Sequence, residues 1–235
     1  MTDTYPITCP IPLDDAALGA TWDAAWTLLG RAAPAGLRAE LMTAWSEPHR
    51  HYHDQRHLRE CLALWMRWRK HCERSGEVAI ALWFLDAIYD PQDGSNELNS
   101  AAWAARALVR AGVDSDTAQC VHDLVMATQH DAPPALGASP DAQLLMDIDL
   151  SILGSAPERF ERYEQDLHKE YVKEYVKEYA RVPRFRYHRA RAQVLQSFLD
   201  RPRLYHGEAA RALLQSQARL NLRAALNSTF TRLEQ

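Results

Sequence analysis

The sequence lacks the features of several large protein classes. Its four cysteines, Cys9, Cys61, Cys72 and Cys120, form no Cys-x-x-Cys pair and no zinc-ligand spacing, which argues against a disulfide framework and a structural zinc site. No window approaches the roughly 18 consecutive apolar residues of a membrane span. The first residues are acidic and proline-containing where a signal peptide has a basic region and an apolar run. We therefore expect a cytoplasmic protein with reduced thiols and no membrane partner.

The chain also has no excess of positive charge. It carries 27 Lys and Arg against 31 Asp and Glu, which gives a formal net charge of −4. A protein that holds a nucleic-acid polymer through its phosphates usually has a basic surface. We therefore expect no nucleic-acid polymer as a partner, whereas a small phosphorylated molecule would need only local positive charge.

Strand-like alternation of apolar and polar residues is missing too, and helical periodicity runs along the chain instead. We expect an all-α bundle of about eight to ten helices, formed by one domain over residues 13–235 behind a flexible arm of residues 1–12. The caps and breaks predict helices over residues 14–31, 34–47, 53–74, 77–90, 95–110, 115–130, 141–153, 157–181, 185–199 and 207–233.

Four of the ten histidines lie within nine residues, at His49, His51, His53 and His57. Imidazole is the commonest protein ligand of transition metals, so the cluster indicates a metal site. A helix that begins near His53 would place His53 and His57 one turn apart on the same face. His57 is the first candidate ligand, and a hydrogen-bonded core histidine is the alternative for it.

A carboxylate inside an apolar helix is a second signal for a cation. Residues 77–90 read EVAIALWFLDAIYD, with Asp86 among the apolar residues. An unpaired carboxylate there would be costly, so we expect Asp86 to contact a cation or a hydrogen-bond network. Asp90 would follow one turn later, where it could act as a general acid or base or cap the turn at Pro91.

Three segments carry the most specific pattern in the chain: YHDQRH at 52–57, WFLDAIYD at 83–90 and DIDLSILG at 147–154. In this order they resemble the predicted metal-dependent phosphohydrolases of the HD superfamily, and the resemblance implies an HD-domain-like helical bundle. The remaining matches are Asn96-Glu97 with Ser100-Ala101, Thr128 with His130, and Val182-Pro183 with Tyr187 and Arg191.

The resemblance implies a divalent metal ion, Mg²⁺, Mn²⁺ or another transition metal, held by His57, Asp86 and Asp149, with Asp147 as the alternative to Asp149. It further implies hydrolysis of a nucleotide or another small phosphate ester by water that the metal activates. The candidate catalytic residues are Asp86, Asp90 and His53, and the candidate substrate contacts are Arg50, His130 and Asn96. A purely structural role is the alternative for Asp86, Asp90, His53, Arg50 and His130.

Leu85 is the main departure from the family pattern. HD proteins have two adjacent ligands, His and Asp, and here Leu85 takes the place of the histidine. Because an isobutyl group cannot coordinate a metal, we expect weak metal binding and slow or no hydrolysis, both improved by Leu85→His. Asp54 and Gln129 are smaller departures, where the family usually has Asn and Lys. The alternative function is a catalytically inactive HD-fold protein with a binding or regulatory role.

One internal repeat follows, with Lys-Glu-Tyr beginning at Lys169, Lys173 and Lys177. The repeat contains no Gly or Pro, so it predicts one uninterrupted helix. The family usually has one such unit of four residues, and the eight residues of two additional units would lengthen the helix by about 12 Å. We expect this helix to protrude into solvent. The alternative is that its tyrosines pack on a second subunit and form a homodimer.

Overall fold

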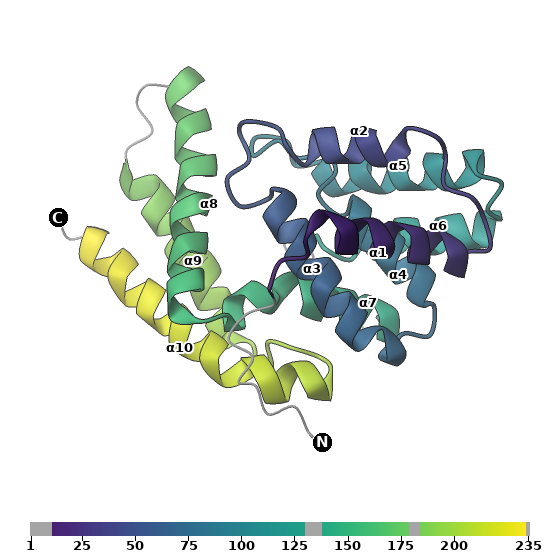
Figure 1. The fold of residues 1–235 in the computed structure, drawn as a ribbon. Coiled ribbons are helices and arrows are strands. Elements are labelled where there is room, and N and C mark those ends of the chain that lie inside the picture. The colour runs from purple at the N-terminus through teal and green to yellow at the C-terminus, as the bar shows by residue number, and fades with distance from the viewer. Residues whose placement is uncertain (1–10, 130–137, 179–183, 234–235) are drawn as a thin grey trace. The chain divides into compact units, whose positions relative to one another are not determined.

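The computed structural model describes residues 11–129, 138–178 and 184–233, and every regular element in these ranges is a helix (Figure 1). The predicted all-α fold is confirmed. Contacts divide the chain into two compact units, Ile11–Asp149 and the described part of Leu150–Gln235. The single domain over residues 13–235 stays a prediction, and residues 1–10 of the predicted arm lie outside the described ranges. None of the described helices is both long and apolar enough to span a membrane.

The unit Ile11–Asp149 is built around one central helix, α4. All of its residues from Gly76 to Phe84 are buried, and it contacts α1, α3, α5, α6 and α7 (Figure 1). A helix that is apolar on every side must be surrounded in this way. The helices of the unit are α1 Asp15–Leu28, α2 Leu37–Ala44, α3 Gln55–Trp68, α4 Ser75–Phe84, α5 Asn96–Arg110, α6 Ser115–Met126 and α7 Pro140–Asp149, with the 3-10 helix η1 Arg69–His71 after α3.

Helix α3 begins two residues later than predicted, because Asp54 caps it. The Asp54 carboxylate accepts hydrogen bonds from the backbone N–H groups of Arg56 (2.8 Å) and His57 (3.3 Å), which have no partner within the helix. His53 therefore precedes the cap and does not lie on α3. The prediction that His53 and His57 are paired by helical spacing is wrong.

Helix α4 ends at Phe84, so the predicted helix over 77–90 is wrong in its second half. Asp86 lies in the turn that follows. The backbone N–H of Ile88 donates to the Ser100 hydroxyl at 3.0 Å in place of a helical carbonyl. Pro91 also disfavours helical geometry at the residue before it. Asp86 and Asp90 therefore do not share a helical face.

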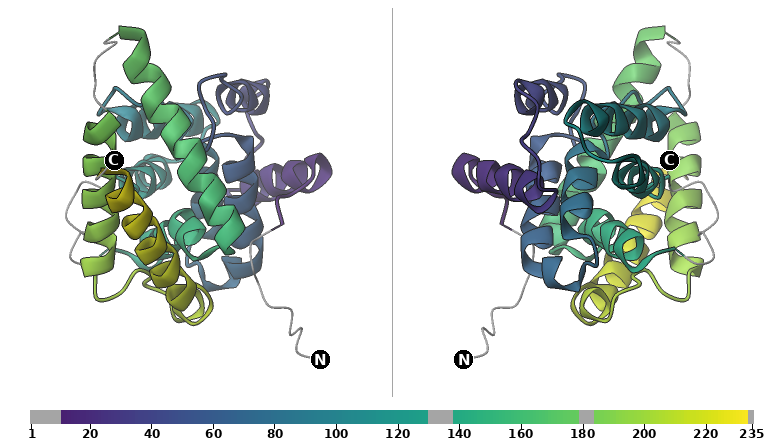
Figure 2. Two further views of the ribbon diagram at one scale, coloured as in Figure 1. Left: turned by 90° about the vertical axis from the view of Figure 1, so that its left-hand side faces the viewer. Right: turned by 90° about the vertical axis from the view of Figure 1, so that its right-hand side faces the viewer.

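The second unit contains the 3-10 helix η2 Leu150–Gly154 and the helices α8 Pro157–Glu178, α9 Arg184–Asp200 and α10 Glu208–Leu233. Helix α10 packs along α9 and against η2 (Figure 2). The helix predicted over 141–153 is corrected here, since α7 changes to η2 after Asp149. Side chains satisfy the carbonyls of this tighter segment: Asn221 donates to Leu153 (2.9 Å) and Ser155 (2.8 Å).

The Lys-Glu-Tyr repeat lies at the end of α8. The helix is uninterrupted as far as Glu178, as predicted, and the rest of the repeat lies outside the described residues. Tyr171 is half-buried, with its ring 6.5 Å from that of Tyr187 on α9. The protrusion and the homodimer stay predictions.

Candidate metal centre

His57 stands at the centre of a buried polar cluster in the unit Ile11–Asp149. It lies in the first turn of α3 with only 2% of its surface exposed. Its Nε2 is 3.1 Å from Oδ1 of Asp149 and 3.7 Å from Oδ2 of Asp86. Its Nδ1 is 3.2 Å from the hydroxyl of Tyr52. Both ring nitrogens therefore have polar neighbours, and Nε2 is the one directed toward the carboxylates.

The three predicted ligands come from three different elements. His57 lies on α3, Asp86 in the turn after α4, and Asp149 is the last residue of α7. These helices contact one another in pairs, so helix packing brings the three side chains together. The predicted convergence is confirmed, with Asp149 rather than the fully buried Asp147 beside His57. That the three bind a metal stays a prediction.

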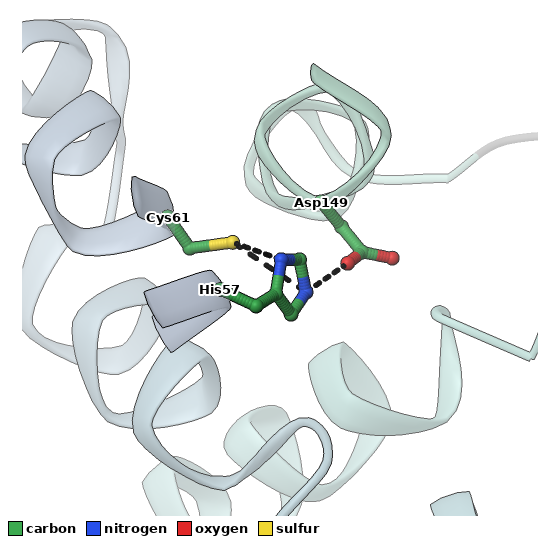
Figure 3. Close-up of side chains that lie close together, drawn as sticks. All are labelled: His57, Cys61 and Asp149. Atoms are coloured by element: carbon green, nitrogen blue, oxygen red, sulfur yellow. Dashed lines mark hydrogen bonds and ion pairs between the residues drawn. The ribbon is translucent and has the colours of Figure 1, made fainter. Parts of the chain in front are cut away.

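Cys61 is the member of the cluster that the sequence analysis missed. It lies one turn after His57 on α3, and its Sγ is 3.7 Å from Nδ1 and 3.8 Å from Nε2 of the ring (Figure 3). His57, Cys61 and Asp149 are all buried, and one ligand atom from each lies within 4.8 Å of the others. Together they form a group that could hold a metal ion. The spacing of four residues within a predicted helix was the available signal.

Burial and the charges of neighbouring groups shift the pKa values of the cluster residues. Burial lowers the pKa of His57, but Cys61 and the hydrogen bond with Asp149 raise it by more, so it lies well above its usual 6.5. Burial raises the pKa of Asp86, and the charge of Asp149 raises it further against the opposing effects of His53 and His57. Burial also raises the pKa of the Cys61 thiol.

This donor set fits a divalent cation. It offers an imidazole, two carboxylates and a thiol, and no apolar group separates Nε2 of His57 from the oxygens of Asp86 and Asp149. Burial is the main cause of the raised pKa of Asp86, and the negative charge of Asp149 adds to it; a cation between the two carboxylates would relieve their repulsion. Metal binding would displace the proton from Nε2.

His53 lies beside the cluster on its more exposed side. Its ring stacks on Tyr89 with centroids 4.2 Å apart and lies 6.0 Å from the ring of His57. His53 is half-exposed, and 19% of the Asp86 side chain is also exposed. The structure thus places this predicted catalytic residue next to the cluster, and its catalytic role stays a prediction.

Arg50 has a structural role in place of the predicted contact with substrate phosphate. Its side chain is fully buried, with Nη1 donating to the carbonyls of His53 (3.0 Å) and Asp86 (2.6 Å), and Nη2 to that of Ala87 (3.2 Å). Its Nε donates to Glu47 at 2.9 Å. These bonds already use the three nitrogens of the guanidinium, so Arg50 holds the turn that carries Asp86 and is not directed at a ligand.

Asp90 and Asn96 hold a loop together, against their predicted catalytic and substrate-binding roles. Asp90 is exposed and its carboxylate accepts from the backbone N–H of Gln92 at 2.9 Å. The Asn96 side chain accepts from the N–H of Asp90 (2.9 Å) and donates to its carbonyl (2.7 Å). The alternative considered for Asp90, a cap of the turn at Pro91, fits the structure better. His130 lies outside the described residues.

Leu85 precedes Asp86 and is buried with 2% of its surface exposed. A scan of protein-family models, a search of curated proteins and a search of solved structures found no match to this chain.

Proposed function

We propose that the protein is a metal-dependent phosphohydrolase of the HD type that acts on a nucleotide or another small phosphate ester in the cytoplasm. The convergence of His57, Asp86 and Asp149 from three separate elements supports this proposal most strongly. Segments distant in the sequence bring one imidazole and two carboxylates together, which is the composition of a hydrolytic metal site.

The ion we propose is a divalent cation, Mg²⁺, Mn²⁺ or another transition metal, held by these three residues. A bound ion of this kind polarises a phosphoryl oxygen and lowers the pKa of a nearby water molecule. Tyr52 orients the imidazole of His57 through Nδ1, 3.2 Å from the hydroxyl. His53, half-exposed beside Asp86, is placed to hold a proton for the leaving group or to contact a phosphate oxygen.

Phosphate release from a panel of nucleotides and phosphomonoesters tests this function. We expect hydrolysis that depends on added metal and that His57→Ala or Asp149→Asn abolishes. His71→Ala changes an exposed histidine of η1 and should leave the rate unchanged. Leu85→His should raise the rate, because it adds the donor that the resemblance implies at this position. Absence of phosphate release from both the wild type and Leu85→His would contradict the proposal.

The second candidate is a catalytically inactive HD-fold protein that binds or regulates. The observation that favours it is the burial of Leu85, which places an isobutyl group where the resemblance implies a ligand. Such a protein would keep the fold and bind a phosphorylated molecule without turning it over. Binding of a nonhydrolysed nucleotide by the wild type, without turnover in any metal, would favour this candidate. A homodimer through α8 is compatible with either function.

A further inference from the structure

We propose that Cys61 is the fourth protein ligand of the metal centre, and that the centre takes a zinc-like ion, Zn²⁺ or Co²⁺, in preference to Mg²⁺. This inference rests on the proposed metal site at His57, Asp86 and Asp149 and deepens it by naming the class of ion. It also replaces the expectation of a weakly held ion, because the cluster then has four donors in spite of Leu85.

The distances around Nε2 of His57 suit a four-coordinate ion. Typical zinc–ligand bond lengths place neighbouring ligand atoms of a tetrahedron about 3.4–3.6 Å apart. From Nε2 the distances are 3.1 Å to Asp149, 3.7 Å to Asp86 and 3.8 Å to Sγ of Cys61, and these three values scatter around the tetrahedral edge. The ligand atoms of His57, Cys61 and Asp149 all lie within 4.8 Å of one another, whereas Asp86 is close to Nε2 but does not belong to that mutually close group. Three donors are therefore already gathered, and Asp86 would move in to complete the four.

Helix α3 holds two of the donors at fixed spacing. His57 and Cys61 are four residues apart within Gln55–Trp68, and both are buried, at 2% and 1% exposure. Two ligands at this spacing project from one face of a helix into one cavity, which is how helical metal motifs present a pair of donors. The chain thus gains a ligand on α3 where Leu85 removes one after α4.

The kind of donor decides the kind of ion. Mg²⁺ prefers six oxygen ligands in octahedral geometry and has little affinity for sulfur. Zn²⁺ and Co²⁺ accept imidazole, carboxylate and thiolate together, commonly in four-coordinate sites. A cluster with one nitrogen, one sulfur and two carboxylates therefore favours the zinc-like ions, and all four donors belong to the single unit Ile11–Asp149.

Metal binding requires a short movement of the sulfur. Sγ is almost equally far from both ring nitrogens, at 3.7 and 3.8 Å, so it lies beside the ring and not on the lone-pair axis of Nε2. Sγ lies no more than 4.8 Å from a carboxylate oxygen of Asp149, and a change in the Cys61 side-chain torsion would have to carry it toward that oxygen for both to bind one ion. On binding, the thiol releases its proton to solvent and the thiolate forms the bond to the metal.

Titration of the metal-free full-length protein with Co²⁺ tests the proposal, because a cobalt–thiolate bond gives a charge-transfer band in the near ultraviolet. We expect this band, together with the visible bands of four-coordinate cobalt, in the wild type. Cys61→Ser should lose the charge-transfer band and bind Co²⁺ at least about tenfold more weakly, the smallest loss expected even for an outer-shell partner. The matched control is Cys72→Ser, at a half-buried cysteine of the same unit. This variant should keep both the charge-transfer band and the wild-type affinity for Co²⁺.

Three outcomes separate this inference from the proposed function. Visible cobalt bands without a charge-transfer band would refute Cys61 as a ligand and leave the site at His57, Asp86 and Asp149 standing. No cobalt binding at all would refute the metal site and the inference with it. If Cys61→Ser does not fold, X-ray absorption of the zinc-loaded wild type decides, since a sulfur at about 2.3 Å from zinc supports the proposal and a shell of only nitrogen and oxygen overturns it.

Discussion

The imidazole of His57 has a different partner at each nitrogen, with the Tyr52 hydroxyl 3.2 Å from Nδ1 and the Asp149 carboxylate 3.1 Å from Nε2. A proton on Nδ1 that is donated to Tyr52 leaves Nε2 to face the carboxylates. Histidine ligands commonly make such an outer hydrogen bond, which fixes both the tautomer and the orientation of the ring. We therefore expect Tyr52 to position His57 for the proposed ion.

Tyr52→Phe tests this role at the scale of one hydroxyl group. The variant keeps the ring and its packing but removes the partner of Nδ1, so we expect metal affinity to fall about 10–100-fold. Tyr205→Phe is the control, since it removes a buried hydroxyl bonded to the carbonyl of Leu150 in the other unit. Isothermal titration calorimetry with Zn²⁺ measures the metal affinity of both variants. Equal affinities in the two variants would show that Tyr52 does not position the ligand.

The sequence indicated much of the site at the level of residue types. Asp86 was identifiable because a carboxylate in an apolar run needs a partner. His57 stood out in the histidine cluster, and Asp149 was implied by the resemblance to HD proteins. Cys61 was missed because a buried cysteine packs in most proteins as a small apolar residue, and only its distance from His57 distinguishes it. Arg50 was misjudged because the sequence does not show that its partners are backbone carbonyls of a turn 36 residues away.

At the scale of elements, the turn after α4 is held by Arg50. The carbonyls of Asp86 and Ala87 lie outside any helix and accept from its guanidinium at 2.6 and 3.2 Å. The apolar run after Glu77 reads as one long helix because nothing within it signals an end before Pro91. The helix ends at Phe84 in a turn that this tertiary contact holds, and a sequence pattern does not report such contacts. The start of α3 was easier to predict from the sequence, since Asp54 is a recognisable N-cap residue.

Arg50→Met should destabilise the fold and the metal site together. The substitution leaves the carbonyls of His53, Asp86 and Ala87 without this donor, and unsatisfied buried acceptors cost about 1–3 kcal/mol each. We expect the free energy of unfolding in urea to fall by about 3 kcal/mol, with metal affinity falling as well. Arg59→Met, whose ion-pair partner Asp15 is exposed, should cost about 1 kcal/mol or less. Similar losses of unfolding free energy in Arg50→Met and Arg59→Met would contradict the role of Arg50 in holding the turn after α4.

The contact between η2 and α10 depends on a glycine. A Cβ added at Gly154 would lie 2.6 Å from the Cβ of Leu214 and 2.8 Å from its carbonyl oxygen, so the backbones would have to separate. We expect Gly154→Ala to lower the free energy of unfolding by about 1–3 kcal/mol, the usual cost of overpacking. At Gly94 nothing lies within 4 Å of such a Cβ, so Gly94→Ala is the matched control. An unchanged melting temperature for Gly154→Ala would show that the two elements are not tightly packed.

At the scale of the whole molecule, the repeat should be dispensable for folding. Leu167 and Glu170 on α8 are buried, so deletion of Glu164–Tyr171 should prevent folding. The repeated Lys and Glu residues predict a solvated helix, so the equally long deletion of Lys173–Ala180 should change the melting temperature little. A collapse of stability in the first deletion would mean that the repeat belongs to the core. Light scattering on the same samples shows whether the repeat also joins two subunits.

The metal centre as a whole is tested most directly by counting the zinc ions that one chain retains in native mass spectrometry. We predict at least one tightly held ion in the wild type and none in Asp149→Asn, because the variant removes a carboxylate 3.1 Å from Nε2 of His57. Asp123→Asn, at a side chain that is 66% exposed, should retain the wild-type number. A wild type that retains no zinc, or an Asp149→Asn variant that retains as much as the wild type, would contradict a metal centre at His57.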